Sequence, residues 1–170
     1  PPHSPTRKRG VEAARLLAAI VESSEDAIIS KDLDVRIMSW NAGAERLFGY
    51  KAEEIIGQSV TVLIASDRHD EEPAILERIR RGERLEHYET VRRRKNGTLF
   101  DISLTVSPIK DENVHVIGAS KIGRDSTGRV KEQRLRAATY AVSSLLAGAF
   151  SPPEVRPLHL HTLRPRGSWW

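Results

Sequence analysis

Few side chains in this sequence combine the residue types and the spacing that catalysis or metal binding requires. The 170 residues include six histidines and no cysteine, which excludes disulfides, thiolate catalysis and cysteine-ligated zinc or iron–sulfur clusters. His159 and His161 stand close together but lack the further ligands of a zinc site. His69 lies in the run Arg68-His69-Asp70 at the start of a predicted helix, where a neutral imidazole could ligate a metal. No glycine-rich phosphate loop or nucleotide-binding box follows Asp125, so we expect a chain that is not itself a catalyst.

The charge pattern argues against a nucleic-acid or membrane partner. The formal net charge is +4, and the basic residues form short clusters separated by acidic ones, whereas a nucleic-acid-binding surface would be more continuous. We interpret the cluster Arg92–Lys95 as the solvated end of a hairpin strand. No apolar run approaches the roughly 20 residues of a membrane helix, and Pro1–Gly10 lacks the apolar segment of a signal peptide. These features predict no membrane insertion and a cytoplasmic location.

The strongest local pattern lies in Ser39–Gly57. The preceding residues, Val35–Trp40, alternate apolar and polar side chains as a half-buried strand does. Asn41 then offers a side-chain oxygen to the free amides of a new helix, Phe48 belongs to the apolar stripe of that helix, and Gly49 ends it. The segment therefore predicts a strand end followed directly by a short capped helix.

The periodicity of apolar residues divides the chain into five parts. Strands are predicted at 26–30, 35–40, 85–94, 99–108 and 114–122, and Asn96-Gly97 is a typical hairpin turn. Short helices and a longer helix at 69–81 separate the second strand from the third, which predicts an α+β fold: a five-stranded antiparallel sheet with helices on one face. The parts are a flexible basic tail (1–10), an amphipathic helix (11–23), a central α+β domain (24–127), a C-terminal helix (128–148) and an irregular proline-rich tail (149–170).

This order of elements resembles that of the PAS family of sensor domains, over roughly Leu16 to Thr127. The resemblance is carried by the Trp40–Tyr50 signature and by four shorter matches: Glu54-x-Ile56-Gly57, Arg93-x-Lys95-Asn96-Gly97, Val106-x-Pro108-Ile109-x-Asp111 and Gly118-x-Ser120-x-x-x-Arg124-Asp125. It implies a PAS-like fold, flanked by N- and C-terminal helices, with a ligand pocket between the helices and the sheet. The residues that the resemblance places in this pocket are Ile28, Ile37, Phe48, Ile102, Leu104, Val116 and Ser120. Each of them could equally be an ordinary core residue.

The cofactor stays unknown from the sequence. Light-sensing PAS relatives use a reactive cysteine, so flavin adduct chemistry is excluded here. Those relatives also bind the flavin ring through amide side chains on the last two strands, and the positions that resemble these amide sites hold Ile102 and Ser120 in this sequence. Haem is the other possibility that the resemblance raises, because Arg68-His69-Asp70 is similar to the iron-binding run of oxygen-sensor kinases. Tyr88, however, stands where those sensors carry a gas-stabilising arginine.

The end of the last strand resembles the family's relay motif, with Asp125 and Thr127 matching it and Ser126 departing from it. These residues imply a signal relay into the following helix, whose apolar spacing suits either a parallel coiled coil or docking on its own domain. We therefore expect a sensory and dimerisation module of a signalling protein such as a two-component histidine kinase, acting in a phosphorelay. The expected partners are a second copy, through the N-terminal helix and the sheet, and an output domain. The alternatives are a haem-based oxygen sensor using His69 and a ligand-free interaction scaffold.

Overall fold

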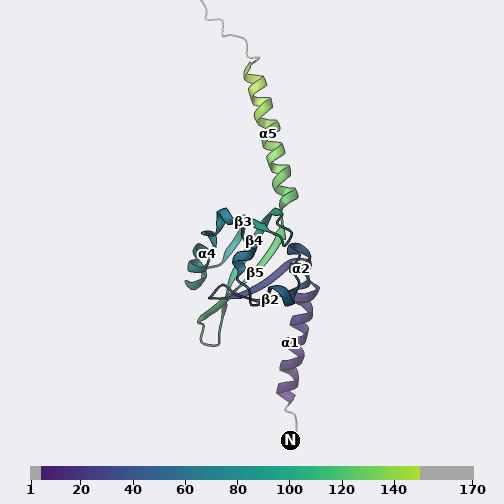
Figure 1. Cartoon of the computed structure of the whole chain (residues 1–170), viewed down its shortest axis with the longest axis vertical. Coiled ribbons are helices and arrows are strands. Elements are labelled where there is room, and N and C mark those ends of the chain that lie inside the picture. Colours follow the sequence, from purple (N-terminus) through teal and green to yellow (C-terminus); the bar gives the residue numbers. More distant parts are fainter. Residues whose placement is uncertain (1–4, 150–170) are drawn as a thin grey trace, which may run out of the picture. The chain divides into compact units, whose positions relative to one another are not determined.

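One antiparallel sheet organises the computed structural model, which describes residues 5–149, with side chains from residue 9 to residue 146. Its strands stand in the order β2-β1-β5-β4-β3, so the first and last strands of the sequence lie side by side at its centre (Figure 1). The predicted five-stranded α+β fold is confirmed. The strands are β1 (Ala27–Asp32), β2 (Ile37–Trp40), β3 (Leu85–Arg93), β4 (Leu99–Lys110) and β5 (Val116–Asp125).

Short helices between β2 and β3 cover one face of this sheet. The core lies between the two layers: Phe48, Ile75 and Ile79 come from the helices and Ile102 and Val106 from β4, each at most 2% exposed. Alternate residues of a strand point to opposite faces, so this face holds every second side chain of β4. The helical elements are α2 (Ala42–Phe48), α3 (Ala52–Ile55), η1 (Val60–Leu63), η2 (Ser66–Arg68) and α4 (Glu71–Arg80).

Buried Asn41 fixes α2 against the sheet. Its Oδ1 accepts hydrogen bonds from Ala44 N (2.9 Å) in α2 and from Ile28 N (2.8 Å) in β1. Its Nδ2 donates to Val21 O (2.8 Å) and Asp26 O (3.0 Å). The predicted cap is therefore present, and the same side chain also ties the segment before β1 to α2.

Two glycines fix the position and the end of α2: Gly43 lies in its first turn, and Gly49 follows its last residue. Gly49 ends the helix in the left-handed conformation (φ 82°) and donates from its amide to Glu45 O, 2.8 Å away, as predicted for a C-terminal cap. At Gly43 a Cβ atom would lie 2.2 Å from Asp26 O, so only glycine fits there.

Helices also flank the sheet in sequence. The first helix, α1, spans Pro5–Ser23 and thus starts inside the predicted flexible tail of residues 1–10; proline is well tolerated in the first turn of a helix, where its missing N–H has no intrahelical partner. The last helix, α5, spans Thr127–Ala149. Residues 150–170 of the predicted proline-rich tail, with His159 and His161, lie outside the described residues.

Among the helices that are described, none is long and apolar enough to cross a membrane. The chain divides into two compact units at Glu132/Gln133, within α5.

Candidate functional site

Five charged side chains from four elements meet inside the core, and we call them the interior ionic cluster: Lys31 of β1, Glu71 and Glu72 of α4, Arg92 of β3 and Lys121 of β5. Lys31, Glu72, Arg92 and Lys121 are 0%, 2%, 3% and 4% exposed, respectively. Glu71 is partly buried at the edge of the cluster. The strands place the three cations there because Lys31, Arg92 and Lys121 occupy core-facing positions of their alternating patterns.

Each carboxylate of the cluster binds a separate set of donors. Glu72 receives hydrogen bonds from both lysines: Lys31 Nζ contacts its Oε1, and Lys121 Nζ lies 2.8 Å from its Oε2. Glu71 accepts a bond from Arg92 NH1 at 2.8 Å and from Thr90 Oγ1 at 2.8 Å. Buried charges are tolerated only when they are paired and hydrogen-bonded in this way.

The cluster nevertheless holds three cations against two carboxylates. Burial, reinforced by the neighbouring Lys121 charge, lowers the pKa of Lys31 to about 7. Burial, reinforced by Arg92, likewise lowers the pKa of Lys121 to about 7. Burial on its own would raise the pKa of Glu71, but hydrogen bonds from Arg92 and Thr90 bring it below its usual value, so this carboxylate is ionised. The surplus positive charge therefore rests on the lysines and Arg92.

A small interior cavity adjoins the cluster. Its volume is about 20 Å³, above the roughly 10–15 Å³ that one water needs and far below the roughly 300–1,000 Å³ of a drug-sized ligand site. Among the described residues, Arg92 NH2 is the buried side-chain nitrogen or oxygen atom without a hydrogen-bond partner, and Arg92 lines this cavity. The lining residues are Ile29, Phe48, Val60, Leu63, Arg92, Ile102, Leu104, Lys121 and Gly123.

The pocket residues expected from the sequence divide into two groups. Phe48, Ile102 and Leu104 line the cavity; Ile37 belongs to the core, and Val116 packs against it. Ile28 and Ser120 lie between core-facing neighbours and therefore point to the other face of the sheet, where both are only partly buried. Their places toward the core are taken by Ile29 on β1 and by Ala119 and Lys121 on β5. The resemblance therefore placed Ile28 and Ser120 one position away from the core-facing phase of their strands.

The burial of Arg92 and Glu72 was also not predicted from the sequence. We interpreted Arg92–Lys95 as the solvated end of a hairpin strand, and we did not single out Glu72. Arg92 and Glu72 are instead in the core. The signal that could have found them is the phase of the pattern, since Arg92 stands two residues from core-facing Thr90 in the same strand.

His69 lies at the end of η2 and is exposed. It does not line the interior cavity, and the described residues contain no group of three or more potential metal-ligating side chains. The residues and the cavity volume therefore do not fit a haem group held by His69.

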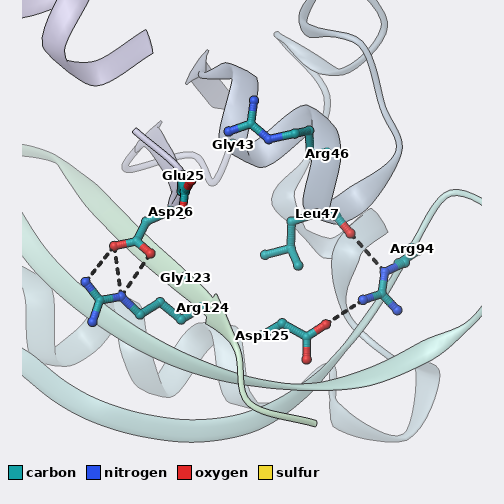
Figure 2. A pocket seen from close by; sticks show the side chains of 9 residues that line it. All are labelled: Glu25, Asp26, Gly43, Arg46, Leu47, Arg94, Gly123, Arg124 and Asp125. Carbon is teal, nitrogen blue, oxygen red and sulfur yellow. Dashed lines mark hydrogen bonds and ion pairs between the residues drawn. The ribbon is translucent and has the colours of Figure 1, made fainter. Parts of the chain in front are cut away.

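A second feature lies at the exit of β5, where Asp125 meets Arg94 beside a surface pocket of about 500 Å³ (Figure 2). Asp125 Oδ2 accepts from Arg94 NH2 at 2.7 Å, and its Oδ1 accepts from Thr127 N at 2.9 Å. Partial burial would raise the pKa of Asp125, but the bonds from Thr127 and the Arg94 charge lower it, so the carboxylate is ionised. Asp125 thus caps the first turn of α5 while it is paired with a cation from the β3–β4 hairpin.

Arg94 extends this contact to the core. Its Nε donates to Leu47 O at the end of α2 (2.9 Å), and its guanidinium carbon lies 4.0 Å from the ring centre of Phe100. Figure 2 shows Arg94 between Leu47 and Asp125. Sequence reasoning selected Asp125 and Thr127 but missed Arg94, which joins them to α2 and to the core. We call Arg94, Asp125 and Thr127 the strand-exit linkage.

Thr127 and Ser126 fasten the same segment to neighbouring strands. Asp101 N donates to Thr127 Oγ1 (3.2 Å), and Ser126 N donates to Asp101 O (2.9 Å). Ser126 Oγ also donates to Glu89 Oε2 (3.0 Å) on β3. A change in the spacing of β3, β4 and β5 would therefore reach the start of α5 directly.

Comparisons with known proteins agree with this geometry. The family model of the PAS fold matches residues 15–125. The chain is 37% identical over 134 residues to two-component system protein A of Emericella nidulans, covering 77% of this chain and 19% of that protein. It is 27% identical to the signal transduction histidine-protein kinase AtoS of Escherichia coli, covering 79% of this chain and 22% of the kinase. The crystal structure of a PAS domain from Colwellia psychrerythraea superposes with a TM-score of 0.64 at 29% identity, covering 68% of this chain and 98% of that one. The chain thus spans about a fifth of the length of these two signalling relatives.

Proposed function

This chain belongs to the PAS family, and from that membership we propose that it is the input module of a two-component signalling protein in the cytoplasm. In this role it binds a small ligand or a partner and passes the change to an output domain through α5. The similarity to a two-component protein and to a histidine kinase supports the signalling role. Any phosphotransfer would be carried out by an output domain and not by the sensory fold.

The observation that carries the proposal is the strand-exit linkage. Arg94 contacts the end of α2, the core ring of Phe100 and the carboxylate of Asp125. Asp125 in turn caps α5. A change in the core that moves β3 against β5 therefore alters the support of the first turn of α5.

The mechanism that we propose is a shift between two populations. In one, Arg94 and Asp125 are paired and the first turn of α5 is ordered; in the other, the pair is broken and that turn opens more often. A ligand drives the change only as far as its affinities for the two states differ.

Hydrogen–deuterium exchange of residues 127–132 tests this relay. In Asp125→Ala, which loses both the cap and the ion pair, we expect exchange to be about fivefold faster, the effect of a typical cap of about 1 kcal/mol. Arg94→Met keeps the cap and removes the bridge, and exchange should again rise. Asp111→Asn is the matched control, because Asp111 accepts Asn113 N and His115 N in the β4–β5 turn. If Arg94→Met left the exchange of α5 unchanged, Asp125 would be a local cap and the relay would be refuted.

A ligand-free interaction scaffold is the second candidate, and the small volume of the interior cavity favours it. Such a scaffold would use its exposed apolar faces to bind a second copy or another protein. Native mass spectrometry of the freshly purified chain separates the two functions, because a co-purifying small molecule argues against a pure scaffold.

A further inference from the structure

We propose that the interior cavity binds a small monovalent anion, held by Arg92 and Lys121. The proposal rests on the proposed sensory function and names the class of its ligand. It assigns to the interior ionic cluster the task of recognising one negative charge.

The count of charges supports an anionic ligand. The cluster contains three cations, Lys31, Arg92 and Lys121, and two carboxylates, Glu71 and Glu72. Arg68 NH1 lies 3.2 Å from Glu71 at the solvent edge and adds further positive charge. Since a net charge in a dry core is costly, one bound monovalent anion would balance the buried groups with every cation protonated.

The cavity is lined by a residue, Arg92, that has an unpaired donor. Arg92 is 3% exposed, and its NH1 is taken by Glu71, Thr90 and the Val91 carbonyl. Its NH2 has no acceptor among the described residues. A guanidinium is always charged and cannot relieve this cost by losing a proton, so the group is suited to an external acceptor.

Lys121 provides the second donor at the same cavity. An ammonium carries three N–H donors, and the structure gives Lys121 Nζ one acceptor among the residues it describes, Glu72. Gly123 also lines the cavity; a Cβ there would lie 2.9 Å from Ile102 Cδ1, so glycine leaves space that a side chain would take.

The volume limits the ligand. A cavity of about 20 Å³ holds between one and two waters at roughly 10–15 Å³ each. Anions of this size are a halide, the smallest carboxylate and the smallest inorganic oxyanions. Larger carboxylates would require the surrounding core to move.

The test is a titration of the full ¹⁵N-labelled chain with sodium formate, sodium nitrite and sodium chloride, each at constant ionic strength held with sodium sulfate. Saturable amide shifts at Gly123 and Ile102 with at least one of the three salts would support the site. Comparison of the three salts then distinguishes a carboxylate, an inorganic oxyanion and a halide. If none of the three salts produces a saturable shift, the proposed anion site is refuted, whatever the variants show.

Two arginines of the same hairpin give a matched pair of variants. Arg92→Met should weaken the binding about tenfold or more, as expected for the loss of a hydrogen bond to a charged group, and Lys121→Met should do the same. Arg93→Met, at the next position of the same strand, should leave the affinity unchanged, because Arg93 neither lines the cavity nor belongs to the strand-exit linkage. Equal affinity in Arg92→Met, Lys121→Met and the wild-type chain would overturn the assignment.

The same spectra separate this inference from the relay. Shifts at Gly123 without any change at residues 127–132 would establish the anion site and refute the proposed relay. Absence of shifts at Gly123 refutes the anion site and leaves the relay to the exchange experiment on Asp125 and Arg94.

Discussion

At the scale of single residues, the unusual feature is the pair of lysines inside the core. Both share the carboxylate of Glu72, and their surroundings also include Arg92, Glu71 and Asp32. Burial lowers the pKa of each lysine from 10.5 to about 7. An unfolded chain returns both to the ordinary value, so folding and proton binding are coupled at these two positions.

This coupling predicts that stability rises with pH above neutrality. Between about pH 7 and about pH 10 the unfolded chain binds more protons than the folded protein, so the free energy of unfolding should increase with pH, by at most about 1.4 kcal/mol per pH unit for each lysine. Urea unfolding at a series of pH values measures the slope. Lys121→Met should flatten it, whereas the same change at exposed Lys110 should not. A flat profile for the wild-type chain would show that both lysines stay charged in the folded state.

At the scale of elements, sequence patterns predicted the sheet and the cap of α2 but not the interior cluster. Asn41, Gly49 and the Asn96-Gly97 turn act through local backbone geometry, which short stretches of sequence specify. Lys31, Glu72 and Lys121 meet only after three elements, β1, α4 and β5, have packed. Their pairing depends on contacts 41 and 49 positions apart in the chain, and no local pattern carries that information.

One added methyl group should lower the free energy of unfolding most where α2 packs against the segment before β1. In Gly43→Ala the new Cβ would lie 2.2 Å from the Asp26 carbonyl oxygen, which is backbone and cannot rotate away, so we expect a loss of about 2 kcal/mol or more. Gly128→Ala is the control: its Cβ would meet nothing within 4 Å, and alanine in a helix is favoured over glycine. Chemical denaturation compares the two, and an equal effect of both would contradict the close approach at Gly43.

At the scale of the whole molecule, both terminal helices carry exposed apolar side chains, and the expected dimer stays a prediction. Leu17 and Val21 of α1 are 63% and 38% exposed, and Leu135 and Leu145 of α5 are 67% and 75% exposed. The sequence predicts that a second copy binds through the N-terminal helix and the sheet. We propose that a second copy covers α1, since apolar stripes of this kind need a partner.

If α1 forms the contact, Leu17→Glu should shift a dimer toward monomer in sedimentation velocity, because a carboxylate would replace a buried methyl-rich side chain. Ala19→Glu adds the same charge to the opposite side of the helix and should leave the dimer intact. A dimer that tolerates Leu17→Glu as well as Ala19→Glu would have to use another surface.

The strand order has a consequence for how the chain is made. Because β1 pairs with β2 on one side and with β5 on the other, the inner edge of β1 has no partner until residues 116–125 have left the ribosome. A growing chain therefore carries an open strand edge, the kind of surface that recruits other chains, while the residues between β1 and β5 are made. Closure depends on contacts between distant parts of the sequence, which form slowly. Of the five strands in this sheet, the last to be translated is the one that completes its centre.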